Sequence, residues 1–130
     1  MKPTSTPPRK SKVHERQKLL FANLLNLLKA RRRYRGTDCS LPALAAALGV
    51  SSRTVTQAVK VCSNGNFSAL INSLRLHDAC AMLSSTRYAH NTIEEIALLT
   101  GFQSRQAFYL AFHRLYGCTP AAYRREHQPA

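Results

Sequence analysis

Hydrophobic residues recur along most of this 130-residue chain at intervals of three and four positions, which is the period of an α-helix. The alternation of period two that is typical of β-strands is nearly absent. Between about residues 13 and 33, a broad apolar stripe predicts a long amphipathic helix. We expect the following helices to cover this stripe, and a contact with a partner protein or a second copy is the alternative. The stripe consists of Leu20, Phe21, Leu24, Leu25, Leu27 and Leu28.

Two later stretches of the chain repeat one pattern. Each predicts a short apolar helix, a tight turn that begins with glycine, and a second amphipathic helix, which is the order of a helix-turn-helix motif. Gly49 and Gly101 begin the two turns. We therefore expect helix-turn-helix motifs at about residues 41–62 and 93–116.

A connecting helix is predicted at about residues 67–84, after a turn-forming cluster at residues 63–66. A helix of this size would be about 27 Å long, close to the roughly 34 Å between successive major-groove faces of DNA. Residues 1–11 are rich in Pro, Ser and Thr and predict a flexible basic arm. The expected fold class is all-α, with about seven helices: two helix-turn-helix subdomains joined by the long connecting helix within residues 12–130.

The charge of the chain is strongly positive. It carries 19 Lys and Arg against 6 Asp and Glu, which gives a formal net charge of +13. Eleven of these cations, but only one of the acidic residues, lie in residues 1–35. Such an excess is typical of a protein that meets polyanions, although a solvated basic terminus is an alternative explanation for the tail. Together with the two motifs, it predicts double-stranded DNA as the partner.

Other chemistry is weakly represented. The most apolar window, residues 19–28, is too short for a membrane span of about 20 residues and starts too late for a secretory signal. The four cysteines are dispersed without a C-x-x-C pair, and His77 with Cys80 would make only half a metal site. No Gly-rich phosphate loop or carboxylate pair is visible. We expect a cytoplasmic protein without membrane contact, enzymatic activity, cofactor or metal.

The second helix of each motif has an apolar face that should pack inward. In the first motif this face carries an aliphatic series, and in the second it carries two phenylalanines. The residues expected to face inward are Val55, Ala58, Val59, Cys62, Phe108, Ala111, Phe112 and Leu115.

The opposite faces are polar and carry side chains that contact DNA well. Arg can pair with guanine and Gln with adenine, while Lys and Thr can contact either bases or phosphates. We expect Lys60, His113 and the basic N-terminal segment to hold phosphates. The residues expected near the bases are Arg53, Thr56, Gln57, Arg105, Gln106 and Tyr109. A solvated polar face is the alternative explanation, but Tyr109 and Leu110 on the second helix favour a groove that offers thymine methyls. The candidate DNA-binding residues are Ser52, Arg53, Thr56, Gln57, Lys60, Ser104, Arg105, Gln106, Tyr109 and His113.

From about Tyr34 to Arg125, the chain resembles the DNA-binding domain of the AraC/XylS family of bacterial transcription regulators. The resemblance implies two subdomains whose recognition helices enter adjacent major grooves, and a transcription factor that works with RNA polymerase. It is most specific in the C-terminal signature, at Ile93, Ile96, Ala97, Gly101, Phe102, Phe108, Phe112, Gly117, Thr119, Pro120 and Tyr123.

The chain also departs from that family pattern. Val59 stands where the family usually has Phe, and Leu70 where it often has Tyr, so a lighter first subcore is expected. Leu110 occupies a position that is often polar in the family. The sequence is compatible with a stand-alone regulator and with part of a larger one. Possible partners are therefore a sensor domain and a second copy of the chain in a homodimer. The alternatives are a helical protein-interaction adaptor that uses the Leu-rich first helix, and a thiol-dependent DNA repair module.

Overall fold

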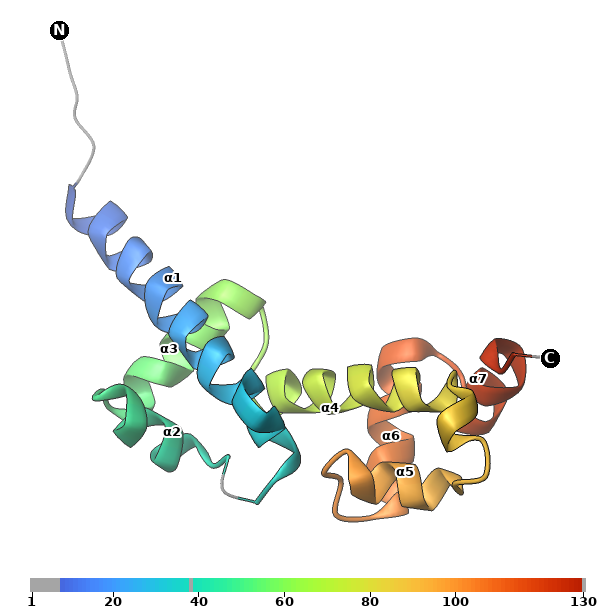
Figure 1. Cartoon of the computed structure of the whole chain (residues 1–130). Helices are drawn as coiled ribbons and strands as arrows, with labels where there is room; N and C mark the ends of the chain where they lie inside the picture. Colours follow the sequence, from blue (N-terminus) through green and yellow to red (C-terminus); the bar gives the residue numbers. More distant parts are fainter. Residues whose placement is uncertain (1–7, 38, 130) are drawn as a thin grey trace, which may run out of the picture. The chain divides into compact units, whose positions relative to one another are not determined.

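The computed structural model describes residues 8–37 and 39–129, with side chains from residue 12 onward. Within this part of the chain there are seven α-helices, two short 3-10 helices and no strand, as the sequence predicted (Figure 1). Residues 1–7 of the predicted arm lie outside the described residues. The chain forms two compact units: unit 1 comprises residues 1–33 and 38–70, and unit 2 comprises residues 34–37 and 71–130.

Unit 1 is built from α1 (Pro8–Lys29), α2 (Leu41–Leu48), α3 (Ser52–Ser63) and the first turn of α4 (Phe67–Leu83). The long helix α1 packs against both α2 and α3 (Figure 1). The first helix-turn-helix therefore covers the apolar stripe of α1, as predicted. The fully buried large side chains of this core are Leu24, Leu28, Leu44, Val55 and Val59.

The ends of α1 differ from the prediction. The helix begins at Pro8, because proline suits a first turn in which its missing N–H needs no partner. It ends at Lys29, where a kink leads into a 3-10 segment, Ala30–Arg35. Within this kink Arg31 and Arg32 have φ values of 56° and 51°, in the left-handed region that L-residues avoid by about 1–2 kcal/mol each. The chain thus leaves α1 through a strained turn.

The first helix-turn-helix has well-defined helix ends. The Ser40 hydroxyl accepts a hydrogen bond from the Ala43 amide at 3.3 Å, and the Ser51 hydroxyl accepts one from the Thr54 amide at 3.1 Å. Gly49 ends α2 with a φ of 73°. These caps satisfy amides that would otherwise lack partners. The motif runs from Leu41 to Ser63, within a residue of the predicted range 41–62.

Unit 2 contains the rest of α4, a short 3-10 turn at Thr86–Tyr88, α5 (Ile93–Leu99), α6 (Arg105–Tyr116) and α7 (Pro120–His127). A capping box at Thr92 and Glu95 starts α5, with hydrogen bonds of 2.8 and 3.0 Å. Three phenylalanines lie in the core beside aliphatic side chains. Its buried residues are Leu76, Ala79, Met82, Leu83, Ile96, Ala97, Phe102, Phe108 and Phe112.

Leu115 was predicted to face inward, and this is wrong, because 53% of it is exposed. The reason lies in where α7 packs. The ring of Tyr116, the next residue, is tilted against two others, with its centre 4.8 Å from that of Phe112 and 6.1 Å from that of Tyr123 in α7. Near its end α6 is therefore covered on the Tyr116 side, and Leu115 stays at the surface.

Candidate nucleic-acid interface

The outer face of α3 carries the side chains that the sequence predicted. Arg53, Thr56, Gln57 and Lys60 are all exposed. On the inner face Val55, Ala58 and Val59 are completely buried. The division into a buried apolar face and an exposed polar face is thus confirmed, and these four predicted side chains are accessible to a partner.

Two hydroxyl groups near the start of α3 are less available for hydrogen bonds with a partner. Ser52 is half-buried. The Thr56 hydroxyl donates its proton to the Ser52 carbonyl oxygen at 3.0 Å, within the helix. In this position Thr56 can offer a partner only its oxygen lone pairs and its methyl group.

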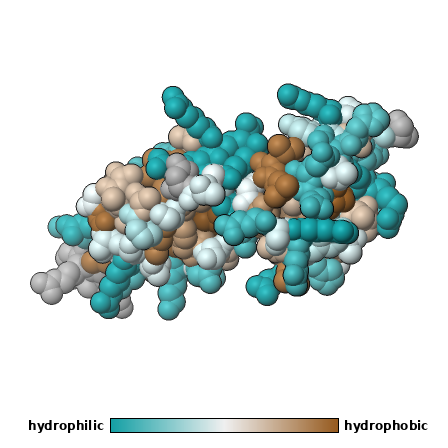
Figure 2. All heavy atoms as spheres, turned by 90° about the horizontal axis from the view of Figure 1, so that it is seen from below, coloured by the Kyte–Doolittle hydropathy of each residue, from teal (hydrophilic) through white to brown (hydrophobic). Residues whose placement is uncertain are grey.

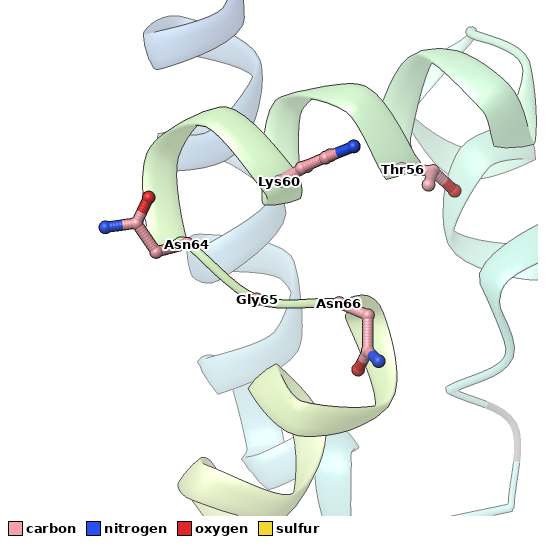
Figure 3. A pocket seen from close by; sticks show the side chains of 5 residues that line it. All are labelled: Thr56, Lys60, Asn64, Gly65 and Asn66. Carbon is pink, nitrogen blue, oxygen red and sulfur yellow. The ribbon is translucent and has the colours of Figure 1, made fainter.

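A hollow of about 480 Å³ lies beside the end of α3, lined by Thr56, Lys60, Asn64, Gly65 and Asn66. Figure 3 shows Thr56 and Lys60 extending from α3, with Asn66 across the turn at the start of α4. The Asn66 side-chain oxygen accepts a hydrogen bond from the Ala69 amide at 2.7 Å. The Lys60 ammonium is a donor that an anionic oxygen could use. The sequence pattern identifies the two asparagines only as part of a turn, because their position beside Lys60 depends on how that turn folds.

The outer face of α6 is similar in character. Arg105, Gln106, Leu110 and His113 are exposed, and Leu110 is 64% exposed. Ser104 caps the helix, since its hydroxyl oxygen accepts a hydrogen bond from the Ala107 amide at 3.1 Å. Its own proton remains available to a partner at the start of the helix.

The sequence predicts that Tyr109 faces outward, but in the structure it is only partly exposed. It is half-buried against the unit 2 core, with its ring edge-on to Phe108 at 6.3 Å. The Arg105 guanidinium lies 5.1 Å from the centre of the Tyr109 ring, and its Nη2 donates to the Tyr109 hydroxyl at 3.5 Å. This hydrogen bond raises the pKa of Arg105. Tyr109 is therefore a support for Arg105 as well as part of the outer face.

The electrostatics of both helices suit an anionic partner. Neither α3 nor α6 contains an Asp or Glu, while each carries cations on its exposed face. On the face drawn in Figure 2, hydrophobic residues reach the surface in separate patches among hydrophilic ones. A polyanion could thus approach either helix without meeting a carboxylate of that helix.

The described residues provide neither a metal site nor a membrane-spanning helix. No group of three or more His, Cys, Asp or Glu side chains there is placed to hold a metal ion, and His77 and Cys80 gain no further ligand. None of the described helices has both the length and the apolar character needed to cross a membrane.

The chain matches the family described as helix-turn-helix domain over residues 44–126. Among curated proteins it is 39% identical over 54 residues to the HTH-type transcriptional activator RhaR of Pectobacterium carotovorum. That alignment covers 42% of this chain but only 18% of RhaR. The chain therefore spans about a fifth of the length of this relative.

Solved structures of AraC-type domains have the same fold. A transcriptional regulator of Chromobacterium violaceum, described as containing an AraC-type DNA-binding domain, superposes with a TM-score of 0.75 at 24% identity, covering 87% of this chain and 96% of that one. The DNA-binding domain of AdpA superposes with a TM-score of 0.68 at 24% identity, covering 81% and 89%. With its two helix-turn-helix motifs and the family match over residues 44–126, the chain belongs to the AraC-type helix-turn-helix family of DNA-binding transcription regulators.

Proposed function

We propose that this chain binds double-stranded DNA sequence-specifically and without catalysis, with α3 and α6 as recognition helices in two adjacent major-groove faces. The proposal rests on one kind of helix surface that occurs twice in the chain, on α3 and on α6. Each of the two helices that follow a helix-turn-helix turn buries an apolar face and exposes a polar face without carboxylates. The AdpA domain, which has the same fold, was solved in complex with a target DNA, and this supports the proposal.

The roles of the side chains follow from their donors and positions. Arg53, Gln57, Arg105 and Gln106 are exposed near the N-terminal parts of the two helices, where helix-turn-helix proteins contact base edges. Lys60 and His113 lie nearer the C-terminal ends and are assigned to phosphates. Ser52 and Ser104, at the starts of the two helices, can donate hydrogen bonds to phosphates. Thr56 presents a methyl group and a hydrogen-bond acceptor. Tyr109 positions Arg105 through its hydroxyl group and its ring.

Because both recognition helices belong to one chain, a single molecule should bind a bipartite site that is not palindromic. Dimeric helix-turn-helix proteins instead read two related half-sites arranged by their two-fold symmetry. We infer cytoplasmic action on a promoter, with RNA polymerase as a further partner. The name of RhaR as a transcriptional activator supports this inference.

The adaptor alternative loses its basis in the structure. It requires the Leu-rich stripe of α1 to be available to a partner protein, but Leu24 and Leu28 are completely buried in unit 1. Among the described side chains of α1, the exposed large hydrophobic ones are Val13 and Leu19.

Binding measurements with substituted proteins test the assignment of base contacts. Arg53→Ala and Gln106→Ala should each weaken binding to the best site by about 1–3 kcal/mol and relax preference at one or two base pairs. The best site is first found by selection from random DNA, and its half-sites are located by footprinting. Arg125→Ala, which removes an exposed cation from α7, is the matched control and should weaken binding to all sequences slightly and equally. Equal losses on specific and random DNA for Arg53→Ala and Gln106→Ala would contradict the assignment.

A further inference from the structure

The segment Tyr34–Thr37, called the strap here, has an unusual place in the chain. In sequence it lies between α1 and α2, which both belong to unit 1. In the structure, however, it belongs to unit 2. The contacts that hold this short segment therefore connect residues more than 40 positions apart, and they involve both α4 and the turn of the second helix-turn-helix.

The first set of contacts centres on Asp78 of α4. The Arg35 Nε and Nη2 atoms donate to Asp78 Oδ2 at 2.8 and 2.7 Å, and the Tyr34 hydroxyl donates to the same oxygen. The Asp78 side chain is only 13% exposed and that of Arg35 is 27% exposed. Tyr34 itself is buried. Charge-assisted hydrogen bonds that are shielded from water in this way are stronger than those of surface pairs.

The second set of contacts joins the strap to the α5–α6 turn. Arg75 Nε donates to the Tyr34 carbonyl oxygen at 2.6 Å, and the Arg75 guanidinium lies 5.8 Å from the centre of the Phe102 ring. Gly101 begins this turn with a φ of 106°. A Cβ atom at Gly101 would come within 2.7 Å of the Arg35 carbonyl oxygen, so the strap backbone lies directly against the turn.

We propose that the strap positions α6 for DNA binding, and that Asp78 is the positioning residue that holds the strap in place. The proposal rests on the proposed function, in which α6 is a recognition helix. The turn that the strap touches leads directly into Ser104 and Arg105, so its conformation sets where α6 begins. When the strap is released, the turn loses its backing at Gly101 and the start of α6 becomes less well ordered.

Asp78→Asn tests this proposal, because two explanations of the role of Asp78 predict opposite changes in the affinity for DNA. If Asp78 acted only as a negative charge, its removal would strengthen binding to all DNA, since a carboxylate repels phosphates. The positioning role predicts instead that affinity for the best site falls at least fivefold. It also predicts weaker discrimination against base changes in the half-site read by α6, with discrimination in the half-site read by α3 unchanged. Glu126→Gln is the matched control, because it removes an exposed carboxylate from α7 of the same unit.

Amide hydrogen exchange supplies a second readout on the same proteins. In Asp78→Asn, exchange at residues 101–105 should become faster, while exchange in α3 should not change. Tyr34→Phe keeps the buried ring and removes only the hydroxyl bond to Asp78, so it should give the same pattern with smaller effects. This variant decides the question if Asp78→Asn does not fold.

The proposal is overturned if Asp78→Asn behaves like Glu126→Gln, or if exchange at residues 101–105 rises while affinity and discrimination stay at their original values. It is also overturned if Tyr34→Phe folds and shows neither effect. An unsubstituted chain that binds its best site and random DNA equally would refute the proposed function, and this result is separate from any effect of the strap.

Discussion

Asn64, at the end of α3, has a φ of 57°, in the left-handed region that favours glycine. A Cβ-bearing residue without a polar side chain is disfavoured there by about 1–2 kcal/mol. We therefore expect Asn64→Ala to lower the free energy of unfolding by about 1 kcal/mol and Asn64→Gly to leave it equal or higher. Urea denaturation of the two variants measures the difference. If both variants lose stability equally, the amide group rather than the backbone conformation is what matters at this position.

For single residues, the helical period predicted which face of each helix is buried, but it did not predict the individual residues that depart from that pattern. It placed Val55 and Phe108 inside and Arg53 and Gln106 outside. It failed at Leu115 and Tyr109, whose burial depends on where α7 and the rest of the unit 2 core pack. Asp78 was missed for a related reason, because its partners are distant in sequence and no local pattern records them.

Between elements, α4, α6 and α7 meet at a group of side chains that resist ionisation. The Tyr116 and Tyr123 rings lie 6.1 Å apart, and Cys80 and Tyr123 pack against the same unit 2 core. Burial raises the pKa of Cys80, of Tyr116 and of Tyr123 above their usual values. Each group therefore keeps its proton in the folded state at a pH where the unfolded chain releases it.

The contribution of these groups to stability should decrease as the pH rises. The contribution of Tyr116 is complete below its ordinary pKa of 10.0 and is lost as the pH rises towards the higher folded value. The melting temperature should therefore fall between neutral pH and about pH 11, and the fall should be less steep in Tyr116→Phe, which has no proton to lose. Thermal denaturation followed by circular dichroism over this range compares the two proteins. Parallel curves would show that Tyr116 does not contribute.

At the same scale, the helices themselves were largely predictable. Caps such as Ser40 and Thr92 and the Gly49 turn are local signals, so the two helix-turn-helix motifs could be located to within a residue or two. The end of α1 could not, because two arginines in the left-handed region break the usual preference.

For the molecule as a whole, charge is the dominant property. With a net charge of +13, the affinity for DNA should fall steeply with salt. Changing Lys2, Arg9, Lys10 and Lys12 to Gln should weaken binding to all sequences alike. If each cation holds one phosphate, the slope of log affinity against log salt should become shallower by up to about 3.6.

Substitution is preferable to truncation in this experiment, because α1 already begins at Pro8 and removal of its first residues would also shorten the helix. Fluorescence anisotropy at several salt concentrations, with the best site and with random DNA, gives both slopes. An unchanged slope would mean that this segment is a solvated tail. A change in preference between the two DNAs would mean that it reads bases.

The division into two units was predicted in outline, since the repeated motif implies two subdomains. The assignment of Tyr34–Thr37 to unit 2 was not, because nothing in the segment itself indicates that its partners are Arg75, Asp78 and Gly101. Contacts of this kind arise from the three-dimensional fold and leave no periodic trace in the sequence.

The position of the strap also sets an order of events during synthesis on the ribosome. Unit 1 has all its residues once Leu70 has emerged, and its helices are close neighbours in the chain. Tyr34 emerges early, but it cannot be buried until Asp78 and then Gly101 have followed, several seconds later at usual rates of elongation. The nascent chain should therefore carry a finished first unit and an undocked strap for that interval, and unit 2 can close only after α7 has emerged.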